Sequence, residues 1–337
     1  MQESKRYRLS WKDLSGIRGQ IYGWSILSII LFHFAEGLVS SDTANNGLRA
    51  LAVAYNAIVG SIGVDVFVIL SGFGIYHSLS RSSDLGRYYH RRAVRVLLPY
   101  AIVGTLFWLV KDLLVLGLPL SSFPKDLFFV SFVTNGVRTV WYVPFIMLMY
   151  AIAPLVYRVM KRGCPALLLV AAWLVVCLGL SMIKPKFFDC VEIALTRVSA
   201  FLLGMGCGKL AEKGEEVPGW LVAVTLLALP LRLIASPLGR PMERTANVLY
   251  AGFIIVLIIF AYRLVDVERM SGALRGFVDR AGACSYELYL THVLIRNLLG
   301  TIGADLTNPF VYAGIVATSI PLALLLQKLQ QLEQGTG

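Results

Sequence analysis

The chain has 337 residues, of which 57% are hydrophobic and 15% are charged, with a formal net charge of +11. Soluble domains carry about 25% charged residues, so this composition excludes a soluble globular protein. Apolar runs of about 17–25 residues recur along the whole sequence, and each is long enough to cross a hydrocarbon layer of about 30 Å as a helix. The sequence therefore predicts an all-α, polytopic membrane helical bundle.

The segment 1–20 is rich in lysine and arginine and precedes the first apolar run. Tyr7, Trp11 and Leu14 recur at helical spacing, which predicts a short interfacial helix, although a solvated basic tail fits equally well. The run that follows is too long for the core of a typical signal peptide, and it contains His33 and Glu36. We therefore expect it to stay in the protein as the first transmembrane helix.

We predict ten transmembrane helices, at about residues 21–39, 57–79, 94–116, 141–158, 165–183, 193–211, 218–235, 247–264, 284–303 and 310–327. With a cytoplasmic N-terminus, the inner segments carry 20 of the 31 lysines and arginines, as the positive-inside rule requires. Both termini are then cytoplasmic, and the positive charge is expected to meet anionic lipid rather than nucleic acid. The predicted organisation is a cytoplasmic or interfacial segment at 1–20, a single transmembrane domain at 21–328 and a cytoplasmic tail at 329–337.

Two titratable side chains, His33 and Asp65, lie inside predicted spans. A charge at the centre of a membrane helix costs about 2.5–3.5 kcal/mol even on lenient scales, so such a residue usually has a function. At 1.5 Å per residue, His33 lies about 18 Å from the inner face and Asp65 about 12 Å from the outer face, so their depths coincide. A carboxylate beside an imidazole prepares it to act as a general base, and Glu36 is a second candidate for that role. The purely structural alternative is a histidine that hydrogen-bonds a neighbouring helix.

Arg91, Arg92 and Arg95 directly precede the third apolar run. Arg91 and Arg95 are four residues apart and share a helix face, with Arg92 alongside. One guanidinium group can bind two phosphate oxygens at once, so the cluster suits a phosphate-rich ligand at the cytoplasmic end of the third predicted span. Membrane anchoring by the positive-inside effect is the simpler interpretation.

The stretch 60–74 is rich in glycine and serine, which permits close helix packing. Ser71 is not part of a G-x-S-x-G nucleophile motif, because Ile69 occupies the first glycine position. We therefore expect no acyl-serine.

The five cysteines form no C-x-x-C pair, and we expect neither a metal site nor a disulfide framework. The apolar stretch 123–133 is too short to cross the membrane and predicts a half-helix or lid on the outer side.

Taken together, these residues resemble acyltransferase family 3, the bacterial integral-membrane acyltransferases. The resemblance is carried in order by Leu31-Phe32-His33, the stretch 63–73 ending in Leu-Ser-Gly-Phe, the Arg91–Tyr100 run, Trp141-Tyr142, Tyr150, Pro154-Leu155, the Phe201–Gly204 step and the Cys284–His292 segment. In one respect the chain departs from the family, because many members have an arginine where this chain has Tyr22. The nearest arginine is Arg18, to which we assign no role from the sequence.

The resemblance implies transfer of an acyl group, commonly acetyl, from cytoplasmic acyl-CoA to a hydroxyl of an envelope carbohydrate or lipid-linked glycan. It implies that His33 is the base and that Arg91, Arg92 and Arg95 bind the donor. We place Ser71 on the donor side and name Asp65 and Glu36 as carboxylates that orient His33. The candidate oxyanion or acceptor contacts are Trp141, Tyr142, Tyr286 and His292.

We expect acyl-CoA to be a donor substrate and no cofactor to be tightly bound. Membrane lipids and the glycan acceptor are the expected partners, in the bacterial cytoplasmic membrane, and the sequence leaves open the acceptor, the acyl length and the oligomeric state. We expect direct transfer, with an acyl-histidine relay as the alternative. The rival function is a transporter of an envelope precursor or a proton-coupled solute, because intramembrane His, Asp and Arg also mark translocation paths. A membrane sensor or partner subunit without catalysis is a third class.

Overall fold

The computed structural model describes residues 10–41, 45–60, 62–218, 227, 230, 234, 240–264 and 272–335. Over these residues the chain is almost entirely helical and forms no strand. Seven helical segments are long and apolar enough to cross a membrane: Asp13–Ser40, Asn46–Arg81, Leu85–Val115, Tyr142–Lys161, Ala166–Ile183, Pro185–Lys213 and Pro309–Glu333. The chain is therefore a multi-pass, all-α membrane protein, as its composition predicts.

The described helices are α2 (Asp13–Ser40), α3 (Asn46–Ile58), α4 (Ile62–Arg81), α5 (Leu85–Trp108), the π-helix η1 (Leu109–Val115), α6 (Ser122–Leu127), α7 (Val130–Asn135), α8 (Tyr142–Lys161), α9 (Ala166–Ile183), α10 (Pro185–Leu195), α11 (Val198–Lys213), α14 (Arg240–Leu264), α15 (Gly272–Ala283), α16 (Ser285–Thr301) and α17 (Pro309–Gly335). Nine of the ten predicted spans overlap one of these helices. The predicted span 218–235 lies outside the described residues, apart from isolated positions. The short apolar stretch 123–133 forms parts of two six-residue helices, α6 and α7.

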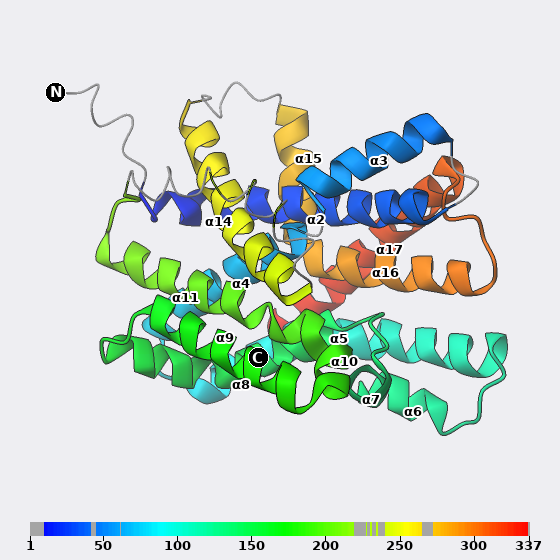
Figure 1. Ribbon diagram of the computed structural model, residues 1–337, viewed down its shortest axis with the longest axis horizontal. Helices are drawn as coiled ribbons and strands as arrows, with labels where there is room; N and C mark the ends of the chain where they lie inside the picture. Colours follow the sequence, from blue (N-terminus) through cyan, green and yellow to red (C-terminus); the bar gives the residue numbers. More distant parts are fainter. Residues whose placement is uncertain are drawn as a thin grey trace.

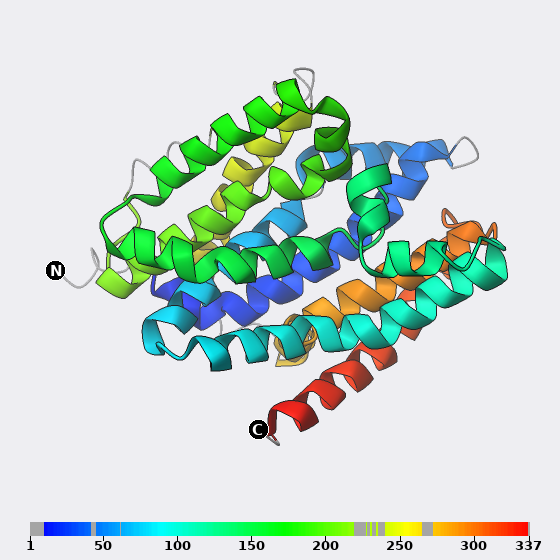
Figure 2. The same cartoon turned by 90° about the horizontal axis from the view of Figure 1, so that it is seen from below.

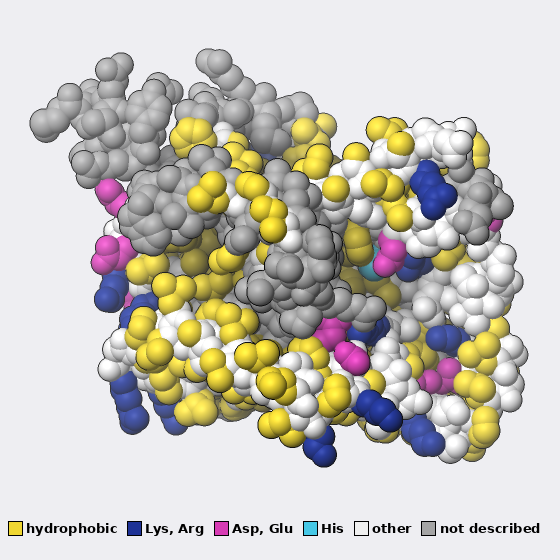
Figure 3. Space-filling model, in the orientation of Figure 1, with side chains coloured by type: hydrophobic (Ala, Val, Ile, Leu, Met, Phe, Trp, Pro, Cys, Tyr) yellow, Lys and Arg dark blue, Asp and Glu magenta, His cyan; other side chains and the backbone are white. Residues whose placement is uncertain are grey.

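Most of the long helices lie side by side along the horizontal direction of Figure 1, and α14 and α15 cross them steeply. Where Figure 3 shows described residues, hydrophobic side chains are frequent, and lysine and arginine lie toward the outline of the molecule and around the hollow on the right. This distribution suits a molecule whose sides meet lipid and whose ends meet water.

Helix α4 lies at the centre of the bundle and packs against α11, α2, α14 and α8. Its contact with α11 is backbone against backbone. A Cβ added at Gly72 would lie 2.2 Å from the Phe201 carbonyl oxygen, and one added at Gly204 would lie 2.0 Å from the Ile69 carbonyl oxygen. Each helix therefore supplies a glycine where the other approaches, as small residues do between membrane helices.

Helix α16 packs against α17, α2 and α5, and Figure 2 shows these helices side by side. A buried polar link joins three of them. The Tyr312 hydroxyl of α17 donates to the Ile30 carbonyl of α2 over 2.7 Å, and it lies 2.7 Å from the His292 Nε2 of α16. Because the Tyr312 hydroxyl donates its only proton to the Ile30 carbonyl, it accepts a hydrogen bond from the His292 Nε2. This link fixes α2 one turn before His33.

Candidate functional site

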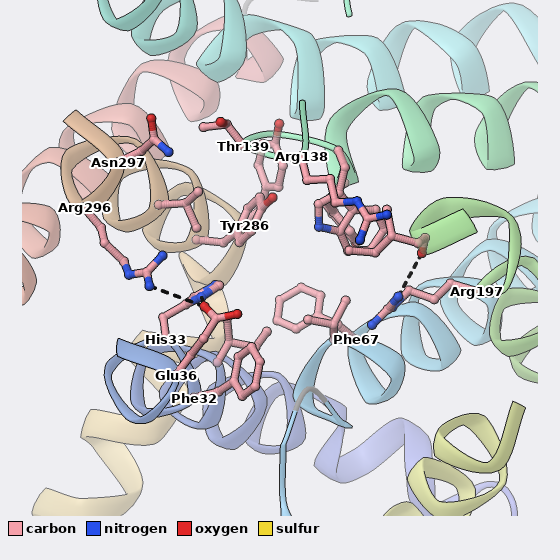
Figure 4. A pocket seen from close by; sticks show the side chains of 17 residues that line it. Phe32, His33, Glu36, Phe67, Arg138, Thr139, Arg197, Tyr286, Arg296 and Asn297 are labelled. Atoms are coloured by element: carbon pink, nitrogen blue, oxygen red, sulfur yellow. Dashed lines mark hydrogen bonds and ion pairs between the residues drawn. The ribbon is translucent and has the colours of Figure 1, made fainter. Parts of the chain in front are cut away.

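A cavity of about 430 Å³ opens between α2, α4, α16 and the segment that precedes α8 (Figure 4). We call it the His33 cavity. Its described lining residues are Ile29, Phe32, His33, Glu36, Val64, Phe67, Arg138, Thr139, Trp141, Tyr142, Ile193, Arg197, Tyr286, Tyr289, Val293, Arg296 and Asn297. Its size is that of a site for a small organic ligand, and its wall combines aromatic rings with a few polar groups.

His33 lies in the wall of this cavity with its side chain 21% exposed. Its Nδ1 is 3.5 Å from the Glu36 Oε2, and the Arg296 Nη2 is 3.3 Å from the same oxygen. One turn of α2 therefore sets the carboxylate beside the imidazole. When Nδ1 carries the proton toward Glu36, the lone pair is on Nε2, which is the state that a general base requires.

Asp65 has a different partner from the one that its depth suggested. Its Oδ1 lies 3.2 Å from the Nε of Arg197, and both residues are 1% exposed. The Arg197 Nη1 donates to the Ile193 carbonyl over 2.8 Å, and its guanidinium lies 4.9 Å above the Trp141 ring. Asp65 is not among the described residues that line the His33 cavity, whereas Arg197 is. A buried charge needs a partner of opposite sign, so Asp65 balances an arginine of the cavity wall.

A second cavity, of about 110 Å³, lies between α2, α4, α5, α8 and α16. We call it the arginine cavity. Its described lining residues are Arg18, Tyr22, Phe67, Ser71, Gly74, Arg92, Arg95, Val96, Tyr142, Ile146, Tyr150, Ser285 and Tyr286. Arg92 and Arg95 are three residues apart and share the helix face that lines it. Arg91 is exposed and is not among these lining residues.

Arg18 reaches the arginine cavity from the first turns of α2. A Cβ added at Gly74 would lie 2.7 Å from the Arg18 Nη1, so the missing side chain of Gly74 leaves the space that the guanidinium fills. Tyr22, one turn later on the same face, also lines the cavity. Arg18 thus approaches the site from one turn before the position at which the resemblance led us to expect an arginine.

Three aromatic residues, Phe67, Tyr142 and Tyr286, line both cavities. We call them the aromatic partition. The Phe67 and Tyr142 ring centroids are 6.4 Å apart and those of Tyr142 and Tyr286 are 6.5 Å apart. The Tyr286 hydroxyl donates to the Val96 carbonyl over 3.0 Å, which ties the partition to α5. His33 and the three arginines of the arginine cavity therefore lie on opposite sides of these rings.

Residues 22–328 match the family model of an acyltransferase domain, that of acyltransferase family 3. The chain belongs to acyltransferase family 3. No curated protein and no solved structure shows a significant match to it. The match runs from Tyr22 in α2 into α17, so it contains every described lining residue of the two cavities of this acyltransferase except Arg18.

The remaining candidates of the acyltransferase lie around the partition. Ser71 lines the arginine cavity, and its hydroxyl donates to the Phe67 carbonyl over 2.9 Å. Trp141 lines the His33 cavity. His292 is fully buried, bonds Tyr312 and is not among the described lining residues, although its ring centroid is 5.6 Å from that of His33. The structure therefore places His292 beside His33 but outside the described wall of the cavity, and its expected role as an oxyanion or acceptor contact stays a prediction.

Sequence reasoning missed four charged residues of this region: Arg138, Glu192, Arg197 and Arg296. Arg197 gave a usable signal, because it falls inside the predicted span 193–211 and a membrane-embedded arginine calls for an acid such as Asp65. Arg138 precedes α8 in a connecting segment, where no hydrophobic pattern distinguishes a cavity residue from a surface one.

Proposed function

We propose that this acyltransferase moves an acyl group, acetyl in the simplest case, from cytoplasmic acyl-CoA to a hydroxyl of an envelope carbohydrate or lipid-linked glycan, with His33 as the general base. The observation that supports it most is the pair of cavities that adjoin at the aromatic partition. One carries the imidazole and arginines that each lie beside a carboxylate, and the other carries Arg18, Arg92 and Arg95 with no carboxylate in its described wall. With a cytoplasmic N-terminus, the arginine cavity opens toward the acyl-CoA and the His33 cavity toward the envelope.

The donor is held by its phosphates. Arg18, Arg92 and Arg95 supply three permanent positive charges, which match the phosphate groups of coenzyme A. A cavity of about 110 Å³ is too small for the nucleotide, so the nucleotide stays at the mouth and the thin pantetheine arm enters. The thioester then meets His33 at the aromatic partition.

The chemistry is an acyl transfer in which His33 takes the proton of the acceptor hydroxyl. The hydroxyl oxygen forms a bond to the thioester carbon, the carbon–sulfur bond breaks, and the thiolate leaves with the electron pair. Glu36 stabilises the imidazolium, and the thiolate is protonated when His33 gives its proton up. Tyr142, at the junction of the cavities, is the hydroxyl placed to donate to the oxyanion.

The decisive experiment replaces the base in purified protein reconstituted in lipid nanodiscs. With acetyl-CoA and a glycolipid extract of the host membrane, we expect His33→Ala to lower acceptor-dependent thiol release by about 10²–10⁴-fold, the usual contribution of a general base. His90→Ala is the matched control, because His90 is exposed and lines neither cavity. An unchanged melting temperature shows that the variant is folded, and full turnover by His33→Ala refutes the assignment.

A further inference from the structure

Every described arginine in the wall of the His33 cavity has a carboxylate partner. Arg197 pairs with Asp65 at 3.2 Å. The other two pairs are Arg138 with Glu192 and Arg296 with Glu36, each at 3.3 Å. Three positive charges therefore meet three negative ones, and the charges of these described groups sum to zero.

The arginine cavity provides an internal contrast. Arg18, Arg92 and Arg95 line it, and none of its described lining residues is acidic. Glu287 acts electrostatically on Arg95 but is not in the described wall. The described wall thus places no carboxylate beside the cations where the polyanionic donor is proposed to bind, whereas on the other side of the aromatic partition each described arginine of the wall has a carboxylate partner.

An anion in the His33 cavity would have to displace a carboxylate from its arginine and leave that carboxylate without a partner. This is costly for Asp65 and Glu192, whose side chains are both 2% exposed. Hydroxyl groups meet no such obstacle, because they donate to carboxylates and accept from guanidinium groups at once. The rings of Phe32, Trp141 and Tyr289 supply apolar faces for the C–H surface of a sugar.

We infer that the residue acylated in the His33 cavity is an uncharged, hydroxyl-rich sugar, and that sugars bearing a carboxylate or a phosphate at the acylated ring are rejected. This inference rests on the proposed function and narrows its acceptor. Rejection by unpaired charge is a common way for a site to gain specificity.

The first test identifies the acylated residue. Purified protein in nanodiscs is incubated with radiolabelled acetyl-CoA and a glycolipid extract of the host membrane; the glycans are released by mild acid and sequenced by tandem mass spectrometry. We expect the acetyl ester on a neutral hexose, deoxyhexose or acetamido sugar. An ester on a uronic acid or a phosphorylated residue overturns the inference and leaves the proposed function intact. Absence of any sugar ester contradicts the proposed function itself, and the inference falls with it.

The second test removes one compensating charge. Glu192→Gln leaves Arg138 without its ion-pair partner, and we expect the share of label on acidic sugars from a mixed extract to rise several-fold. The double variant Arg138→Gln, Glu192→Gln keeps the balance and should keep the preference for neutral sugars. Asn297→Arg, which adds a cation to the wall without removing an acid, should shift the preference in the same direction as Glu192→Gln. Unchanged preference in both unbalanced variants overturns the inference.

Discussion

At the scale of single residues, the site depends on a carboxylate oxygen with two partners. The Glu36 Oε2 lies 3.5 Å from the His33 Nδ1 and 3.3 Å from the Arg296 Nη2. Arg296 holds the carboxylate in place, and the carboxylate orients the imidazole. Such supporting contacts set the tautomer of a catalytic histidine without touching the substrate.

Glu36→Gln tests this chain of contacts. The amide keeps the size of the side chain but cannot balance an imidazolium, so we expect kcat to fall about tenfold or more with little change in the KM for acetyl-CoA. Glu215→Gln, at an exposed position, is the control. A rise in the KM for acetyl-CoA at constant kcat would instead place Glu36 in donor binding.

Gly74→Ala tests the position of Arg18. The new Cβ would lie 2.7 Å from the guanidinium, so Arg18 must leave its place in the arginine cavity. We expect the KM for acetyl-CoA to rise about 5–10-fold, the effect of one weakened charged contact of about 1–1.4 kcal/mol. Gly179→Ala, where no other atom lies within 4 Å of the added carbon, should leave KM unchanged. Equal KM values for the two variants would show that Arg18 does not contribute to donor binding.

At the scale of helices, the close contact of α4 with α11 explains why Asp65 forms an ion pair with Arg197. Residue depth could be estimated from the sequence, since it follows from the rise per residue, but depth does not say which neighbour a helix face meets. Gly72 and Gly204 let the two backbones touch, and this draws Asp65 toward the start of α11. Nine predicted spans overlap described helices, and His33 lies in a cavity wall, because both predictions rest on local hydrophobic patterns. The pairing of Arg138 with Glu192 depends on how distant segments pack, which no local pattern encodes.

Gly204→Ala tests the α4–α11 contact. The added carbon would lie 2.0 Å from the Ile69 carbonyl oxygen, so the helices must separate. Overpacking of this kind costs about 1–3 kcal/mol, and we expect a lower melting temperature in nanodiscs. Gly179→Ala on α9 serves again as the control. If both variants have the same melting temperature as the wild type, the contact between α4 and α11 is looser than the structure shows.

At the scale of the whole molecule, the two cavities share one layer of rings, so the described residues place a thin aromatic wall between two recesses. This arrangement favours a reaction at the barrier over the passage of a solute through it. In the proposed mechanism, the layer would limit the access of water from the His33 cavity to the thioester until an acceptor fills that cavity.

Phe67→Ala removes one ring of the aromatic partition. Water should then reach the bound thioester, so we expect the acceptor-independent hydrolysis of acetyl-CoA to increase several-fold, as measured by thiol release without glycolipid. Phe67→Leu keeps an apolar barrier and should stay close to the wild type. Identical background hydrolysis in Phe67→Ala would show that Phe67 does not exclude water.

Because the same layer separates the two sides of the proposed reaction, the movement of charge across the membrane in each turnover depends on where the proton goes. In the proposed orientation, the base faces one aqueous compartment and the sulfur departs toward the other. If the imidazolium gives its proton to the departing thiolate, a turnover moves no net charge. If the proton instead escapes outward, one elementary charge crosses per turnover, and a potential of 100 mV then changes the free energy of the cycle by about 2.3 kcal/mol. The route of that single proton decides whether the membrane potential of an energised cell opposes acylation or has no effect on it.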